Sequence, residues 1–141
     1  MNKRNKKGFT LIELLVVMII LGLLAALVAP KFFGKIGESK IKAAKTQISL
    51  LGSALDSFYL DVGRYPTTEE GLDALIKRPD TIPESKWKGP YLPKTKIPLD
   101  PWGNKYIYKS PGEHGKYDLY SYGADGQPGG SGENADIVSW E

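Results

Sequence analysis

One uninterrupted apolar segment near the amino end constrains this chain more than any other feature. The segment runs from Phe9 to Ala29, a stretch of 21 residues in which Glu13 is the one charged side chain. A helix rises about 1.5 Å per residue, so this stretch would span roughly 30 Å, the thickness of the hydrocarbon core of a bilayer. The sequence therefore predicts a membrane-spanning helix at residues 9–29.

The residues before this segment are basic and supply most of the net charge. The chain carries a formal charge of +3, and Lys3, Arg4, Lys6 and Lys7 all precede Gly8. Without these four cations, 15 basic residues face 16 acidic ones. The calculated pI of about 9.0 therefore gives no support to nucleic-acid binding. Cations beside a membrane helix favour the cytoplasmic side, which predicts a cytoplasmic amino end and a following domain outside the cytoplasm.

A carboxylate near the start of a membrane helix needs a physical explanation. Placing one there costs roughly 2.5 kcal/mol or more on insertion scales. A cation from another copy of the chain would offset that cost, because a paired charge in a low dielectric is much less unfavourable than an unpaired one. The alternative is that Glu13, four positions after Phe9, reaches the lipid headgroups instead.

Beyond the apolar segment, the pattern predicts an amphipathic helix. Pro30 is expected to end or kink the first helix. Apolar residues then recur at steps of three and four, which is typical of a helix with one buried face. These residues are Ile41, Ala44, Ile48, Leu51, Leu55, Phe58 and Val62. Gly63 suits the position just after the last helical residue.

The remainder of the chain predicts a small antiparallel sheet. Residues 105–108 and 117–122 alternate as strands, with a hairpin loop at 111–115, and residues 137–140 form a last strand. Thr67 or Thr68 is expected to cap a short helix that contains Leu72. The fold class is therefore α+β, with a long amino-terminal helix packed on a small sheet. Aromatic residues on such strands are interpreted as packing groups, although they also occur on carbohydrate and nucleic-acid surfaces.

Residues that carry chemistry are scarce. The chain has no cysteine and one histidine, His114, in a glycine-rich loop. Disulfides, thiolate metal sites and cysteine nucleophiles are therefore excluded. We find no nucleophile with a base, no phosphate loop and no zinc spacing, so the sequence predicts a protein that is not an enzyme.

The segment Gly8-Phe9-Thr10-Leu11-Ile12-Glu13 resembles the class III signal of type IV pilin-like proteins. The resemblance implies that a membrane aspartyl prepilin peptidase removes residues 1–8 by cutting between Gly8 and Phe9. It also implies that the new amine of Phe9 is methylated. In a staggered bundle of helices, Glu13 of one subunit would then meet the Phe9 amine of a neighbour.

Three further motifs point to one branch of that superfamily. Residues 64–72 (RYPTTEEGL), 100–104 (DPWGN, with Tyr106) and 121–126 (SYGADG) resemble the major pseudopilin of type II secretion systems, the general secretion pathway protein G family. The resemblance extends from Gly8 to Trp140, and Tyr122 departs from it by standing where relatives often carry an aliphatic residue.

The resemblance implies a type IV pilin-like fold with three parts: a leader at 1–8, a transmembrane and filament-core helix at 9–29, and a periplasmic domain at 30–141. It implies a structural subunit of the bacterial inner membrane that polymerises with itself into a pseudopilus and drives export of folded proteins. The implied partners are minor pseudopilins, the inner-membrane assembly platform, the prepilin peptidase and N-methyltransferase, and the secretin channel.

The glycine-rich stretch from Asp125 to Asp136 is a candidate calcium loop. Its acidic side chains and flexible backbone offer the oxygen ligands that Ca²⁺ prefers, although it lacks the helix-loop-helix calcium motif. The resemblance implies that Ca²⁺ binds in this loop through aspartates and main-chain carbonyls. Carried over, the ligands are the side chains of Asp125 and Asp136 and the carbonyls of Tyr122, Gln127 and Ser131, with Glu133 as a weaker candidate.

Two other functions remain open. The first is a type IV pilin of a surface pilus, which shares the leader and the helix. Such pilins usually carry a disulfide-closed loop, and this chain has no cysteine to form one. The second is a membrane-anchored calcium-binding module that never polymerises. A substitution of Glu13 by leucine separates this module from the two assembling proteins.

Overall fold

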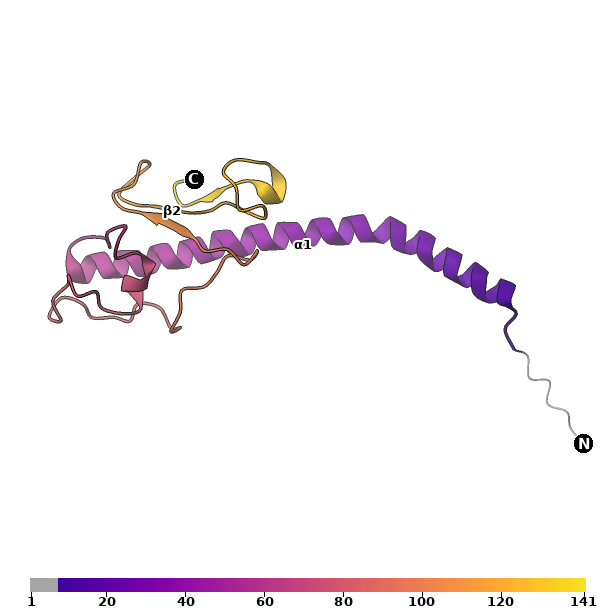
Figure 1. The fold of residues 1–141 in the computed structure, drawn as a ribbon, viewed down its shortest axis with the longest axis horizontal. Helices are drawn as coiled ribbons and strands as arrows, with labels where there is room; N and C mark the ends of the chain where they lie inside the picture. The colour runs from indigo at the N-terminus through magenta and orange to yellow at the C-terminus, as the bar shows by residue number, and fades with distance from the viewer. Residues whose placement is uncertain (1–7) are drawn as a thin grey trace, which may run out of the picture. The chain divides into compact units, whose positions relative to one another are not determined.

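A computed structural model describes residues 8–141. The elements are the helix α1 (Leu11–Val62), the 3-10 helix η1 (Leu72–Leu75), strands β1 (Ile107–Lys109) and β2 (Asp118–Ser121), the 3-10 helix η2 (Gly132–Asn134) and strand β3 (Ile137–Val138). The predicted α+β class is confirmed (Figure 1). The chain divides into two compact units, with the boundary between Ile36 and Gly37, and each is described by itself.

The first unit contains the apolar part of α1. Thr10 precedes the helix, and its hydroxyl accepts a hydrogen bond from the Glu13 backbone N–H at 3.2 Å, which satisfies one of the free donors of the first turn. Pro30 lies inside α1, so of the two predicted outcomes, an end or a kink, the helix end does not occur. A proline removes one intrahelical hydrogen bond, and the many remaining bonds of a 52-residue helix are sufficient to continue it.

In the second unit, α1 buries the predicted apolar stripe. Leu55 and Phe58 have no exposed surface, and Leu51 is 1% exposed. Ile41 and Val62, at the ends of the stripe, are partly buried against the same core. The helix ends at Val62, and Gly63 follows with a φ of 90°, as the sequence predicted. This stripe is the reason that the helix packs on its own sheet.

The sheet has three antiparallel strands in the order β1–β2–β3. Leu119 of β2 is fully buried, and Ile137 of β3 is 6% exposed. In Figure 1 the orange and yellow strands lie beside α1, and their buried residues join the helix in one hydrophobic core. The strands are found where they were predicted, but β3 stops at Val138 rather than Trp140.

The connection between α1 and β1 is mostly irregular and is ordered by side chains. The Thr67 N–H donates to Oε1 of Glu70 at 2.8 Å, and the Glu70 N–H donates to the Thr67 hydroxyl at 3.1 Å. This reciprocal pair closes a turn, whereas η1 begins at Leu72 without a side-chain cap. The predicted helix cap is therefore a turn cap. The expectation that the aromatic residues pack is confirmed, because Tyr106 and Tyr108 are buried members of the core.

Candidate functional site

The predicted processing segment is accessible where it would be cut. Gly8 and Phe9 precede α1 in non-helical backbone, and Phe9 is 86% exposed. A Cβ placed on Gly8 would have no neighbour within 4 Å. A peptidase needs an accessible peptide bond, and the Gly8–Phe9 bond lies in exposed, non-helical backbone.

Glu13 lies in the first turn of α1 and is exposed. A negative charge there is favoured by the helix dipole. Within residues 8–141, no ion pair includes Glu13. The exposed Glu13 carboxylate can therefore be reached by a cation from outside the described residues.

The amino-terminal part of α1 has an apolar surface on every side. The large apolar residues from Leu11 to Val28 are each about half exposed or more, with Leu11 at 87% and Val16 at 47%. A soluble monomer rarely exposes so large a contiguous apolar area. The helix is long and apolar enough to cross a membrane once.

The glycine-rich loop brings its two predicted aspartates into contact with backbone amides. Oδ1 of Asp125 accepts a hydrogen bond from the Gln127 N–H at 3.1 Å. The two carboxylate oxygens of Asp136 accept from the Gly129 N–H at 3.1 and 3.2 Å. Asp136 thus ties the end of the loop to its middle.

Main-chain carbonyls crowd into this loop. A Cβ on Gly123 would lie 2.5 Å from the Glu133 carbonyl oxygen and 2.7 Å from that of Ala135, and one on Gly130 would lie 2.5 Å from the Asn134 oxygen. Both glycines have positive φ, 80° and 99°. Carboxylate and carbonyl oxygens are the donors that Ca²⁺ takes, so the donor chemistry of the loop fits this ion. No cluster of three or more His, Cys, Asp or Glu occurs in residues 8–141, so a site here would depend on carbonyls.

Three other predicted ligands, Glu133, Ser131 and Tyr122, lie in different surroundings. The Glu133 side chain lies against α1, where its carboxyl carbon would be 2.6 Å from a Cβ on Gly37. Its carbonyl accepts the Ala124 N–H at 2.8 Å. The Ser131 carbonyl accepts the Asn134 N–H at 3.1 Å. Tyr122 packs edge-on against Tyr120 with ring centroids 5.3 Å apart.

One supporting residue was not predicted from the sequence. Asp100 is 4% exposed, and its Oδ1 accepts the N–H groups of Trp102 and Asn104 at 3.0 and 2.8 Å. Its Oδ2 accepts the Ser121 hydroxyl. The DPWGN motif contained the signal, because Asp and Asn are the side chains that close such turns.

The RYPTTEEGL motif forms a structural ion pair. Arg64 donates two hydrogen bonds to Glu70, at 2.6 and 3.0 Å, and the Glu70 carboxylate also accepts the Thr81 hydroxyl. The Glu70 side chain is 7% exposed. The hydrogen bond from Arg64 is the largest cause that lowers the pKa of Glu70 to about 2. This motif holds the first turn after α1.

Two family models match this chain, one in its amino-terminal segment and one in the remainder. A family model described as "Type II secretion system (T2SS), protein G" matches residues 31–140. A second, described as "Prokaryotic N-terminal methylation motif", matches residues 3–29.

Relatives match along nearly their whole length. The Type II secretion system core protein G of Pseudomonas aeruginosa is 49% identical, and the alignment covers 100% of this chain and 99% of the relative. The protein of the same name from Vibrio cholerae is 45% identical over 97% of this chain and 93% of the relative. A crystal structure of the major pseudopilin from the type 2 secretion system of enterohaemorrhagic Escherichia coli superimposes with a TM-score of 0.62 at 34% identity, covering 77% of this chain and 92% of that one.

Proposed function

Because this chain belongs to the type II secretion system protein G family, we propose that its polymer moves folded proteins toward the outer-membrane secretin. The chain is a structural subunit of the pseudopilus. The observation that carries the mechanism is the apolar surface of the amino-terminal part of α1 next to the exposed carboxylate of Glu13. Such helices associate side by side with each other or with lipid.

The assembly step depends on a new charge. Cleavage after Gly8 would turn the Phe9 nitrogen into a cation, and Glu13 of an adjacent subunit would pair with it. In a low dielectric the pair is far less costly than either charge alone. Only one axial offset between subunits brings the two groups together, so the pair would also set the register of the filament.

The location follows from the same helix. The chain fits a single-pass protein of the inner membrane. Its basic leader supports a cytoplasmic amino end and a periplasmic carboxyl-terminal domain. The partners that we propose are further copies of the chain, the minor pseudopilins, the assembly platform, the peptidase that also methylates Phe9, and the secretin.

We also propose that the glycine-rich loop holds Ca²⁺. Asp125 and Asp136 would supply carboxylate oxygens, and Tyr122, Gln127 and Ser131 would supply carbonyls, with Glu133 the weaker candidate because its side chain lies against Gly37. The ion would supply a local positive charge that binds several backbone segments at once. In a chain without cysteine, it would replace a disulfide as the constraint on this loop.

The processing step is tested by intact-mass spectrometry of the protein from a host that carries a prepilin peptidase. The expected result is loss of Met1–Gly8 together with one added methyl group, about 14 Da on Phe9. A full-length chain, while the same peptidase cuts another substrate, would contradict the proposal.

The secretion role is tested by complementation. In a bacterium whose own protein G gene is deleted, the chain should restore export of a type II substrate to the medium. A surface pilus is not favoured by the comparisons, and it would be indicated by long extracellular fibres with no recovery of export. A processed protein that yields neither fibres nor export would support the anchored module.

A further inference from the structure

Strand β1 lies at one edge of the sheet, because the strand order is β1–β2–β3. Tyr108 of β1 faces Leu119 of β2 in the register. The N–H of Leu119 donates to the Ser139 hydroxyl at 3.1 Å, and its carbonyl accepts the Ser139 N–H at 2.9 Å. Leu119 therefore directs both backbone groups toward the β3 side of the sheet.

This arrangement fixes which way Tyr108 points. In an antiparallel ladder the N–H and C=O of a residue share a direction, and alternate residues point to opposite neighbours. Since Leu119 turns away from β1, its facing residue Tyr108 must direct its own N–H and C=O to the open edge. Tyr106, two residues earlier, has the same direction.

Ser110 supports this assignment independently. It continues the same alternation, and its N–H and carbonyl are both engaged by the Thr68 hydroxyl, at 2.9 and 3.1 Å. Thr68 thus occupies the open edge at Ser110 as a neighbouring strand would. Within residues 8–141, no loop or turn hydrogen bond engages the backbone groups of Tyr106 or Tyr108, and Tyr108 faces Leu119 in a pair that exchanges no hydrogen bonds.

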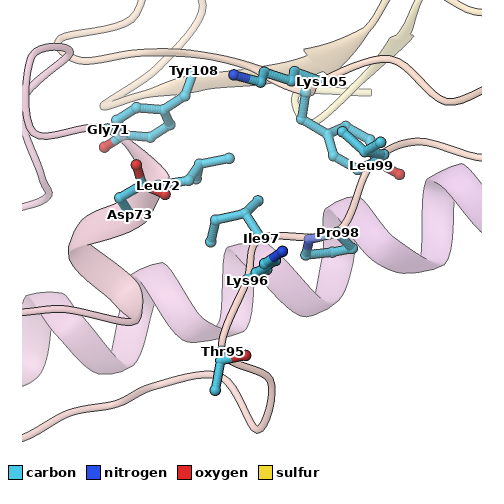
Figure 2. A pocket seen from close by; sticks show the side chains of 11 residues that line it. Gly71, Leu72, Asp73, Thr95, Lys96, Ile97, Pro98, Leu99, Lys105 and Tyr108 are labelled. Atoms are coloured by element: carbon cyan, nitrogen blue, oxygen red, sulfur yellow. The ribbon is translucent and has the colours of Figure 1, made fainter.

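A groove of about 460 Å³ runs along this open edge. Figure 2 shows β1 above it and the segment that contains Ile97 and Pro98 below. Leu72 and Ile97 project into it. Leu99, which also lines the groove, is 49% exposed. The groove therefore has an apolar floor and lies beside the edge strand, where Tyr106 and Tyr108 are 7% and 9% exposed.

The charged side chains around the groove give it a net positive charge. Lys96 and Lys105 line it and are exposed, whereas Asp73 is its one acidic residue. Figure 2 shows Lys105 extending from the β1 side over the opening. A ligand that matches this rim carries carboxylates.

We propose that this groove binds an extended, acidic segment of a partner protein, which adds a strand to the open edge of β1. Backbone pairing with Tyr106 and Tyr108 would supply up to four hydrogen bonds, the source of affinity in strand addition. Alternate side chains of such a segment point to opposite faces. One set fills the apolar floor over Leu72 and Ile97, and carboxylates of the other set meet Lys105 and Lys96.

Backbone pairing requires an extended partner segment and does not suit a helical one. A helix satisfies its own backbone groups internally, so it would leave the edge groups of Tyr106 and Tyr108 without partners. An extended segment also suits the short edge, since β1 has three residues and Thr68 closes the edge at Ser110. The site accepts a segment of a few residues rather than a whole domain edge.

The test uses the full chain in detergent micelles and an acetylated hexapeptide that alternates glutamate and valine. Two control peptides separate the contribution of charge from that of backbone pairing. One alternates lysine and valine, which reverses the charge. The other repeats the acidic sequence with N-methylated alternate amides, which cannot pair as a strand. Binding is measured by NMR titration and by hydrogen exchange of the Tyr106 and Tyr108 amides.

The expected result is saturable binding of the acidic peptide, with slower exchange at Tyr106 and Tyr108, and no binding of either control peptide. Lys105→Glu should weaken binding about tenfold through charge repulsion, and Lys96→Glu should act in the same direction. Lys86→Glu, an exposed lysine outside the groove, should leave binding unchanged.

Several results would overturn the proposal. One is the absence of saturation at millimolar peptide, and another is equal binding of the N-methylated peptide, which would reduce the contact to charge attraction. Shifts that map away from β1 would also exclude it. Protection of the same amides that grows with protein concentration in the absence of peptide would assign the edge to a second copy of the chain instead.

Discussion

Ser121 donates a hydrogen bond of 2.7 Å from its hydroxyl to Oδ2 of Asp100, and both side chains are buried. The same hydroxyl accepts the N–H of Gly123 at 3.1 Å. Asp100 therefore holds the DPWGN turn with one oxygen and, through Ser121, the start of the glycine-rich loop with the other. Two motifs that are separate in the sequence are one hydrogen-bonded unit in the fold.

Removing the Ser121 hydroxyl should destabilise the domain. Ser121→Ala leaves a buried oxygen of Asp100 and the Gly123 N–H without this partner, which costs about 1–3 kcal/mol. Urea unfolding of the full chain in micelles, followed by circular dichroism, measures the loss. Ser53→Ala is the matched control, because Ser53 is an exposed helical serine. Equal midpoints for the two variants would refute the role assigned to Ser121.

Two glycines of the loop should respond differently to alanine. Gly123 and Gly129 both have φ near 80°, so each substitution carries backbone strain of order 1 kcal/mol. A Cβ on Gly123 would also meet two carbonyl oxygens within 2.7 Å, whereas one on Gly129 has no neighbour within 4 Å. Gly123→Ala should therefore be the more destabilising by several kcal/mol, or prevent folding, in the same unfolding assay. The opposite order would mean that the loop is not packed as described.

Acid should weaken the ion pair that follows α1. The pKa of Glu70 is lowered from 4.5 to about 2, first by the hydrogen bond from Arg64. A lowered carboxyl pKa stabilises the fold fully above about pH 4.5, the unfolded value, and this contribution is lost as the pH falls through the folded value near 2. Because Arg64 is 42% exposed, solvent screening reduces this contribution to about 1 kcal/mol, well below the full value of the shift.

Urea midpoints of the native chain and Glu70→Gln, measured from pH 6 down to about pH 2, check this expectation. The native chain should be more stable at pH 6, and the gap should close toward the acidic end as Glu70 takes up its proton. Glu69→Gln is the control, because Glu69 is exposed and outside the network. A gap that stays constant with pH would show that the ionisation of Glu70 is not what stabilises the turn.

Substituting Glu13 should separate membrane insertion from assembly. Glu13→Leu makes the segment more apolar, so insertion and cleavage should persist or improve. Assembly should fall sharply because the Phe9 amine would then have no carboxylate partner. Cross-linking in membranes detects the multimers, and Glu38→Leu, an exposed carboxylate further along α1, is the control. Normal multimers from Glu13→Leu would exclude the charge pair.

Removing calcium should loosen the glycine-rich loop. A ligand at a hundredfold excess over its dissociation constant stabilises the folded state by about 2.7 kcal/mol, so EGTA should lower the melting temperature. Asp125→Asn and Asp136→Asn should each lose that response, whereas Glu133→Gln should largely keep it. Added Mg²⁺ should not substitute, because it requires a stricter octahedral geometry. Identical melting curves with EGTA and with Ca²⁺ would contradict the proposal that the loop binds calcium.

The sequence was sufficient for the elements whose signals are local. The apolar stripe on α1, the end of that helix at Gly63 and the positions of the strands all follow from periodicity and turn residues, which short-range geometry imposes. The candidate site residues Gly8, Phe9, Glu13 and the loop aspartates were also read from local motifs. At Pro30 the sequence left an end or a kink open, and the helix continues because a single missing hydrogen bond does not end a long helix.

Only the tertiary structure decided what depends on contacts between distant residues. Nothing local in the chain pairs Asp100 with Ser121, turns the Glu133 side chain toward Gly37, or directs the backbone groups of Tyr108 to the edge of the sheet. These features arise when the sheet closes on α1 and every buried polar group must find a partner. The sequence alone determined which segments form helix, strand and membrane span, because those choices are made by neighbours along the chain. The packing of the second unit determined which polar groups are satisfied and which remain free to bind.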